Sequence, residues 1–237
     1  EMGCIYTESP LDRRGMNPGT DFKLIKSYYR LIRRIKPDVV LSYTIKPNIY
    51  GGLICRVLKI PLIANVTGLG TAVGNESILQ RVLVTLYKSA FKKAECIFFQ
   101  NGSNKDFFIN HGITLRRYKV IPGSGINTDE FQYQEYPKDA NVVRFLFIGR
   151  IMKDKGIEEL IEAAKRIKEE HTNVQFDALG FCEDEYKDKV EILQEKNIIT
   201  FHGVKDTVRE YLKSSHAVIH PTYHEGMSNV LLEAAAT

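Results

Sequence analysis

Short runs of β-branched and aromatic residues alternate along the chain with longer segments whose apolar residues recur every three or four positions. The short runs are typical of buried strands, and the longer segments are typical of amphipathic helices. The pattern predicts strands at residues 39–43, 61–66, 96–100, 118–121, 142–148, 174–179, 198–201 and 217–220. It predicts helices at residues 22–36, 49–58, 77–93, 104–110, 156–170, 185–196 and 207–213, and from 229 onward. Strands and helices that alternate in this way form parallel sheets covered by helices on both faces, so the predicted fold class is α/β.

The alternation is interrupted once, between Pro122 and Ala140. This segment is rich in Gly, Pro, Asp and Asn and has no hydrophobic period, which is typical of a linker. The net charge also changes sign, from +8 over residues 1–137 to −4 over residues 138–237. We therefore expect two domains, residues 1–137 and 138–237. The chain opens on a helix before any complete strand–helix unit and closes within a helix, so we expect both domains to be incomplete.

Composition narrows the class of protein. Hydrophobic residues make up 43% and charged residues 26% of the chain, as in globular proteins. No apolar run approaches the roughly 18 residues that a membrane-spanning helix needs. The four cysteines contain no CxxC pair, which argues against zinc modules and disulfide scaffolds. A cytoplasmic location is expected.

Residues 22–36 predict a helix with one apolar face and a polar face that is entirely basic. The basic residues are Lys23, Lys26, Arg30, Arg33, Arg34 and Lys36. Such a helix can lie on an anionic membrane surface. An α/β layer favours the other interpretation, a helix that packs its apolar face on its own sheet and leaves the basic face in solvent. The sequence leaves both possibilities open.

A glycine-rich turn, GLGTAVG from Gly68 to Gly74, follows a predicted strand and precedes a predicted helix, as in dinucleotide-binding turns. The glycine spacing is off by one, and the next strand ends in Gln100 and Asn101 rather than in an acidic residue. The pattern therefore favours a turn that lines a ligand cleft over a dinucleotide site.

Three histidines, His216, His220 and His224, recur at every fourth position, as metal ligands do on a helix. The residues between the first two are strand-like, and Pro221 follows His220. The three side chains therefore cannot share a helical face, and no metal site is predicted here.

The turn after the predicted strand 142–148 contains Gly149, Arg150 and Lys155. An arginine can hold a diphosphate with two hydrogen bonds, and a lysine can hold it as a point charge. Because ligands of α/β proteins bind at the carboxyl ends of the strands, these cations are candidates for binding an anion.

The turn after the predicted strand 217–220 leads through Glu225 into a helix. The residues at the start of that helix are Gly226, Met227, Ser228 and Asn229. Free N–H groups and the helix dipole at such a start favour a phosphate or sugar oxygen. Glu233 lies about one turn further on, so two carboxylates flank the predicted anion site.

These segments resemble a known family. FIGRIMKDKGIEELIEA and HPTYHEGMSNVLLEAAA are similar to the donor domain of retaining glycosyltransferase family 4, which has the GT-B fold of two facing Rossmann-like domains. LSYTIKPNIYGGLICRVLKIPLIANVTGLGTA and VIPGSGINTDEF resemble its capsule and O-antigen branch, which includes bacterial transferases acting on undecaprenyl-diphosphate-linked acceptors. The resemblance covers essentially the whole chain.

The resemblance implies a role for each candidate residue. Arg150 and Lys155, beside Gly149, would hold the nucleotide diphosphate, and Glu225 would be the catalytic residue that contacts the transferred sugar. The segment Gly226, Met227, Ser228 and Asn229 would supply backbone N–H groups to the sugar and the phosphates. Glu233 would bind the ribose, and Val204 would lie against the base. No catalytic histidine is carried over, because this chain has Thr67 where many relatives have a histidine.

The implied activity is transfer of a hexose or N-acetylhexosamine, with retention, from a nucleotide sugar in which UDP is expected. The acceptor would be a lipid-diphosphate-linked saccharide in bacterial surface-polysaccharide or glycan synthesis, held by the N-terminal domain at the inner face of the cell membrane. No cofactor or metal is expected, because cations and helix N–H groups can stabilise the leaving diphosphate. No nucleic acid partner is expected. A UDP-N-acetylglucosamine 2-epimerase-like enzyme and a non-catalytic nucleotide-sugar-binding module remain alternatives.

Overall fold

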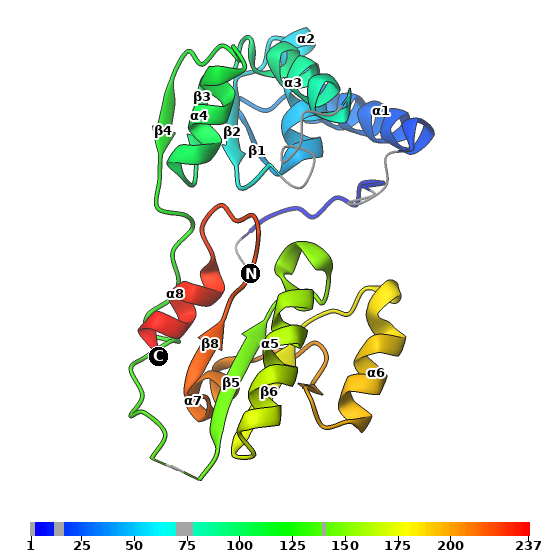
Figure 1. Ribbon diagram of the computed structural model, residues 1–237. Coiled ribbons are helices and arrows are strands. Elements are labelled where there is room, and N and C mark those ends of the chain that lie inside the picture. Colours follow the sequence, from blue (N-terminus) through cyan, green and yellow to red (C-terminus); the bar gives the residue numbers. More distant parts are fainter. Residues whose placement is uncertain (1–2, 12–16, 70–77, 139–140) are drawn as a thin grey trace. The chain divides into compact units, whose positions relative to one another are not determined.

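The computed structural model describes residues 3–11, 17–69, 78–138 and 141–237 and divides the chain into two compact units (Figure 1). The units are Glu1–Gly123 and Ser124–Thr237, so the division falls before the expected boundary at Pro137. The segment between these two positions belongs to the second unit because it packs there. Phe131 contacts that unit's core, the Gln134 N–H donates to the Thr237 carbonyl (2.6 Å), and the Tyr136 hydroxyl donates to the His216 carbonyl (2.9 Å).

The first unit is built on a parallel sheet in the order β1-β2-β3-β4. Its strands are β1 Val40–Tyr43, β2 Leu62–Val66, β3 Cys96–Phe99 and β4 Tyr118–Val120. Its helices are α1 Pro18–Ile35, a π-helical turn at Pro47–Gly51, α2 Gly52–Leu58, α3 Ile78–Phe91 and α4 Gly102–Asn110. The centre of the core is aromatic: the rings of Tyr87, Phe91, Phe99 and Phe108 are fully buried and contact one another.

The second unit has a parallel sheet in the order β7-β6-β5-β8. Its strands are β5 Val143–Ile148, β6 Val174–Leu179, β7 Thr200–Phe201 and β8 Ala217–Ile219. Its helices are α5 Ile157–Glu170, α6 Lys187–Glu195, α7 Arg209–Ser214 and α8 Asn229–Ala236, with 3₁₀ turns at Lys153–Lys155 and Asp184–Tyr186.

Alternate residues of the second sheet belong to different cores. Phe147 and Phe176 pack with α5 and α6, whereas Leu146 and Leu179 pack with α7 and α8. Helices therefore cover both faces of the sheet, as Figure 1 shows for this unit. The predicted α/β class, with two parallel-sheet domains, is confirmed.

The central strand β5 lies between β6 and β8, which lie on opposite sides of it. The helix that follows β5 packs on one face of the sheet, and the helix that follows β8 packs on the other. In open parallel sheets such a reversal creates the crevice in which ligands bind, at the carboxyl ends of the strands. The two turns singled out in the sequence follow these two strands.

Each predicted strand and helix is present, with ends shifted by a few residues. The first helix begins at Pro18 because the Asn17 side chain accepts the Gly19 N–H at 2.9 Å and caps it. Gly68 lies just after β2, but residues 70–74 of the glycine-rich turn are outside the described residues. No helix in the described part of the chain has the length and apolarity needed to cross a bilayer.

Candidate functional site

The carboxyl end of β5 is held tightly to the end of β6. The Gly149 N–H donates to the Leu179 carbonyl at 2.9 Å, and a Cβ on Gly180 would lie 2.0 Å from the Gly149 carbonyl oxygen. Gly180 also has φ +138°, so only glycine allows this close approach. The result is a rigid base for Arg150, the next residue of the chain.

The Arg150 guanidinium lies near a carboxylate that the sequence analysis did not identify. Its Nη1 is 3.8 Å from Glu183 Oε1, with 48% of the arginine side chain and 16% of the glutamate side chain exposed. Glu183 is held in place because the segments after β5 and β6 remain hydrogen-bonded: its N–H donates to the Ile151 carbonyl at 3.2 Å. The sequence could have indicated Glu183, because it follows β6 and so lies at the same sheet edge as Arg150.

The turn before α5 is fastened to the loop after β8. The Tyr223 N–H and the Thr222 hydroxyl donate to the Asp154 carbonyl at 3.1 and 3.3 Å. Gly156 has φ +74°, and a Cβ there would lie 2.1 Å from the Pro221 carbonyl oxygen. Two segments that lie far apart in the sequence are therefore in backbone contact.

This contact brings two of the predicted site residues together. The Lys155 ammonium donates to Glu225 Oε1 in an ion pair whose side chains are 21% and 32% exposed. A third group lies beside them: His220 Nε2 is 3.7 Å from the same carboxylate oxygen. Burial lowers the pKa of His220 below its ordinary value, and Lys155 adds to this effect, while Glu225 opposes it.

The start of α8 lies at the same edge of the sheet. Ser228 is its N-cap and accepts the Leu231 N–H at 3.4 Å, while the side chain of Asn229 accepts the Ser124 hydroxyl at 3.1 Å. Gly226 and Met227 form the link from Glu225 to this cap. A helix start leaves its first N–H groups without intrahelical partners, which suits an anionic ligand.

Glu233 lies in α8, one turn after its start, and is partly buried. Burial raises the pKa of its carboxyl above the ordinary value, and the negative charge of Glu130 raises it further. The structure therefore separates the environments of the two glutamates, since Glu225 is paired with a lysine and Glu233 faces another acid.

Val204 is 67% exposed in the loop that follows β7. It shares the carboxyl edge with the other predicted residues, but β7 is three positions from β8 in the strand order. At a strand spacing of about 4.8 Å this corresponds to about 14 Å. The structure thus does not bring Val204 into the Lys155–Glu225 cluster, and only an elongated ligand would reach both.

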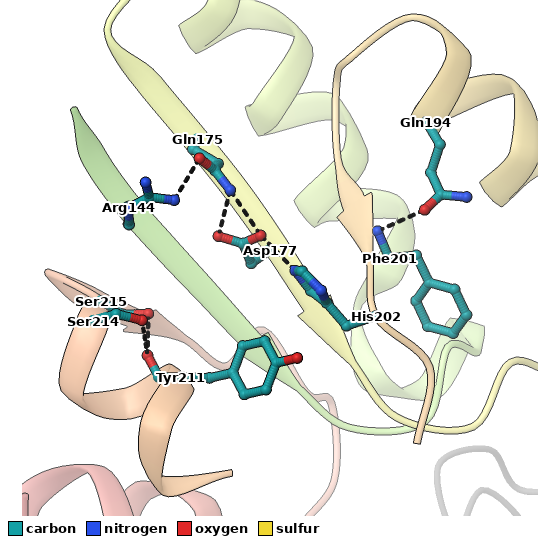
Figure 2. Close-up of polar contacts among 9 residues, drawn as sticks. All are labelled: Arg144, Gln175, Asp177, Gln194, Phe201, His202, Tyr211, Ser214 and Ser215. Atoms are coloured by element: carbon teal, nitrogen blue, oxygen red, sulfur yellow. Dashed lines mark hydrogen bonds and ion pairs between the residues drawn. The ribbon is translucent and has the colours of Figure 1, made fainter. Parts of the chain in front are cut away.

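A buried polar network fixes the base of the Val204 loop (Figure 2). Asp177 on β6 is 7% exposed, and its carboxylate accepts from His202 Nε2 at 2.7 Å and from Gln175 Nε2 at 3.0 Å. Arg144 Nη1 donates in turn to Gln175 Oε1 at 2.5 Å, and the His202 ring lies against the ring of Tyr211. A buried carboxylate needs such partners. The signal in the sequence was a single acid within the otherwise apolar end of a strand.

The three regularly spaced histidines are not on a helix: His216 precedes β8, His220 follows it, and His224 lies in the loop beyond. Among the residues that the structure describes, no three His, Cys, Asp or Glu side chains gather in a way that could hold a metal ion.

The basic face of α1 is exposed, and its apolar face is only partly packed. Leu24 and Ile32 are buried, whereas Phe22 and Ile35 are 66% and 58% exposed. An open cavity of about 540 Å³ runs along the helix, and its lining includes four cations, Lys23, Lys26, Arg30 and Arg34.

The two units define a class of protein with paired Rossmann-like domains and a candidate anion site at the switch point of the second sheet. Two family models match the chain, "Glycosyl transferase 4-like" over residues 5–101 and "Glycosyl transferases group 1" over residues 143–237. Both models describe glycosyltransferases and together they cover most of the chain, so the predicted resemblance to these enzymes is confirmed.

Curated relatives agree with this assignment. The chain is 27% identical to the N,N'-diacetylbacillosaminyl-diphospho-undecaprenol alpha-1,3-N-acetylgalactosaminyltransferase of Campylobacter jejuni, over 100% of this chain and 66% of the relative. It is 28% identical to the capsular polysaccharide biosynthesis glycosyltransferase CapM of Staphylococcus aureus, over 92% of this chain and 61% of the relative. The chain thus spans about three fifths to two thirds of the length of these two relatives.

Solved structures show the same fold. Anabaena HepE in complex with UDP-glucose matches with a TM-score of 0.73 at 19% identity, over 92% of this chain and 62% of that protein. Sucrose-phosphate synthase from Thermosynechococcus elongatus matches with a TM-score of 0.73 at 18% identity, over 94% of this chain and 60% of that protein. The predicted GT-B-like fold is confirmed.

Proposed function

We propose that the protein is a retaining glycosyltransferase that moves a hexose or N-acetylhexosamine from a UDP-sugar to a lipid-diphosphate-linked saccharide. The observation that carries the donor part is the arrangement at the carboxyl edge of the second sheet. There Arg150, Lys155 and the start of α8 supply positive charge, and Glu225 supplies a carboxylate beside it. HepE, which has the same fold, was crystallised with UDP-glucose, which supports UDP as the nucleotide.

On this proposal the donor lies along the sheet edge. The diphosphate binds Arg150, Lys155 and the N–H groups of residues 226–229, the ribose binds Glu233, and the base lies near Val204. The separation of about 14 Å between the β7 and β8 loops suits a molecule with its base at one end and its sugar at the other.

Transfer requires the sugar to leave from the β-phosphate, which gains negative charge as the bond breaks. Cations and helix N–H groups aimed at that phosphate stabilise this charge, and they do so without a metal ion. Glu225 orients the reacting sugar. The acceptor hydroxyl attacks from the face that the diphosphate leaves, so the configuration is retained.

The donor role of the two cations can be tested by substitution. Arg150→Ala and Lys155→Ala should each weaken binding of UDP-glucose or UDP-N-acetylglucosamine by about 1.5–3 kcal/mol, the scale of hydrogen bonds to charged groups. Isothermal calorimetry measures the change. Arg166→Ala is the matched control, because Arg166 pairs with Glu162 on the exposed side of α5. Unchanged affinity in both test variants would refute the diphosphate role.

Assigning the sugar to Glu225 and the ribose to Glu233 gives a second test. Glu233→Ala should weaken UDP and UDP-sugar alike, since both carry ribose. Glu225→Ala should spare UDP, weaken the UDP-sugar and lower turnover. An equal loss of UDP affinity in both variants would contradict the assignment.

The lipid-linked acceptor is supported by the relatives, since the Campylobacter protein is named for an undecaprenol-diphosphate acceptor. We place the enzyme in the cytoplasm, on the inner face of the membrane, with the first unit on the acceptor side. The exposed basic face of α1 supports this, because each Lys or Arg near an anionic surface contributes about 1 kcal/mol. Sedimentation with vesicles should increase with phosphatidylglycerol content and decrease with salt. Equal binding to neutral phosphatidylcholine vesicles would exclude the electrostatic contact.

Product analysis separates the proposed reaction from the alternatives with the same fold. A transferase forms a new glycoside on the lipid-linked acceptor and releases UDP. An epimerase-like enzyme would release UDP or an altered sugar without an acceptor, and a binding module would give no product from either substrate.

A further inference from the structure

His220 occupies an unusual position in the second unit. It follows β8 at the switch point of the sheet, and only 10% of its side chain is exposed. Its Nε2 is buried and has no hydrogen-bond partner within the described ranges of the chain. The carboxylate oxygen Glu225 Oε1 lies 3.7 Å from it, which is too long for a hydrogen bond.

A buried polar atom without a partner destabilises a fold, so it needs an explanation. His216, which directly precedes the same strand, is the contrast, because its Nδ1 accepts the Arg144 N–H at 3.0 Å. Burial also keeps His220 in its neutral form, in which Nε2 can carry the single ring hydrogen. That atom is aimed at the glutamate that pairs with Lys155.

We propose that His220 is a positioning residue that holds Glu225 in place when the donor binds. This inference rests on the proposed function. Lys155 and His220 approach the same oxygen of Glu225. When the diphosphate takes the ammonium of Lys155, the carboxylate loses this ion pair. A shift of about 0.8 Å then brings Nε2 of His220 to hydrogen-bond distance, at about 2.9 Å. The partner that Nε2 lacks is thus gained in the donor complex, and Glu225 is held toward the transferred sugar.

The test uses three variants of the full chain. His220→Leu removes the donor group, and His220→Gln keeps an N–H at a similar reach. His216→Leu is the matched control, at the residue before β8. Calorimetry with UDP, UDP-glucose and UDP-N-acetylglucosamine measures binding, and a melting curve measures stability.

We expect His220→Leu to weaken the UDP-sugar by about tenfold or more and to weaken UDP much less, because only the UDP-sugar carries the group that Glu225 would contact. The same variant should melt at the parent temperature or roughly 2–8 °C above it, since an unsatisfied buried group is removed. His220→Gln should recover most of the affinity. His216→Leu should melt lower, because it leaves the Arg144 N–H without its acceptor, and should bind the donor as the parent does.

Two results would overturn the proposal. If His220→Leu binds the UDP-sugar as tightly as the parent, His220 does not position Glu225. If it melts well below the parent and His220→Gln does not recover binding, the histidine is an ordinary packing residue. Failure of the parent itself to bind any of the three nucleotides would instead refute the proposed function, and this inference with it.

Discussion

Replacing Gly156 by alanine tests whether the close backbone approach to Pro221 holds the two halves of the site together. Gly156 has φ +74°, and an added Cβ would lie 2.1 Å from the Pro221 carbonyl oxygen and 2.7 Å from its carbonyl carbon. The left-handed backbone alone should cost about 1–2 kcal/mol. Displacing the Pro221 segment should add about 1–3 kcal/mol, the usual range for an overpacked contact. We expect Gly156→Ala to lower the free energy of unfolding by about 2–5 kcal/mol.

Gly125→Ala is the matched control in the same unit. Gly125 has φ +72°, but nothing lies within 4 Å of the position that its Cβ would take. It should therefore show the backbone cost of about 1–2 kcal/mol and no more. Urea unfolding of both variants gives the two free energies, and their difference measures the contact with Pro221.

The same variant should also weaken binding of the UDP-sugar, because moving the loop after β8 separates Lys155 from Glu225. Gly125→Ala should bind as the parent does. Equal destabilisation by the two alanines, or full donor affinity in Gly156→Ala, would show that the contact does not organise the site.

Three further outcomes can be checked. Asp177→Ala should leave the His202 and Gln175 donors without an acceptor and lower the free energy of unfolding by about 1–3 kcal/mol, as urea unfolding would measure. If the Val204 loop holds the base, calorimetry should also show weaker binding of UDP. Burial and Lys155 lower the pKa of His220 in the folded protein, although Glu225 opposes this. The unfolded chain therefore binds more protons than the folded protein as pH falls through about 6.5, and the free energy of unfolding should decrease there. The decrease should be less steep in His220→Leu. The pKa of Glu233 is raised in the folded protein, so ionisation of its carboxyl destabilises the fold. Glu233→Gln should therefore have a higher free energy of unfolding than the parent at pH 7. The difference should disappear in denaturation curves recorded below about pH 4.5.

The fold could be predicted from hydrophobic period because each strand of a parallel sheet is an apolar run and each helix has one apolar face. The hydrophobic period does not indicate which unit a linker packs against. For that reason the observed boundary, after Gly123, differs from the expected one at Pro137. Phe131 lies in a segment without any period, yet its ring enters the core of the second unit. Such contacts, together with the hydrogen bonds of Gln134 and Tyr136, place the division before the charge reversal near Pro137.

The candidate site was predictable where chemistry follows directly after a strand. Arg150, Lys155 and Glu225 all follow β5 or β8, and parallel strands place such residues at one edge of the sheet. The ion pair between Lys155 and Glu225 was not predictable, since it depends on the hydrogen bonds to the Asp154 carbonyl and on the absence of a side chain at Gly156. His220 was judged by its spacing from the other histidines, and its burial beside Glu225 appears only in three dimensions.

The ion pair between Lys155 and Glu225 raises the question of how a donor could enter a site whose charges are already matched. A partly exposed ion pair stabilises a protein by only about 0–1 kcal/mol. A diphosphate offers Lys155 more than one negative charge and hydrogen bonds of about 1.5–3 kcal/mol. Replacing the ion pair by contacts with the diphosphate therefore favours ligand binding. Before binding, the ion pair orders both side chains, and it does not block the ligand. His220 then supplies one donor to Glu225, and UDP alone supplies no further one. The hydroxyls of a sugar can donate to this carboxylate. Once Lys155 has released Glu225, the sugar part of the donor therefore contributes to the affinity of the whole donor.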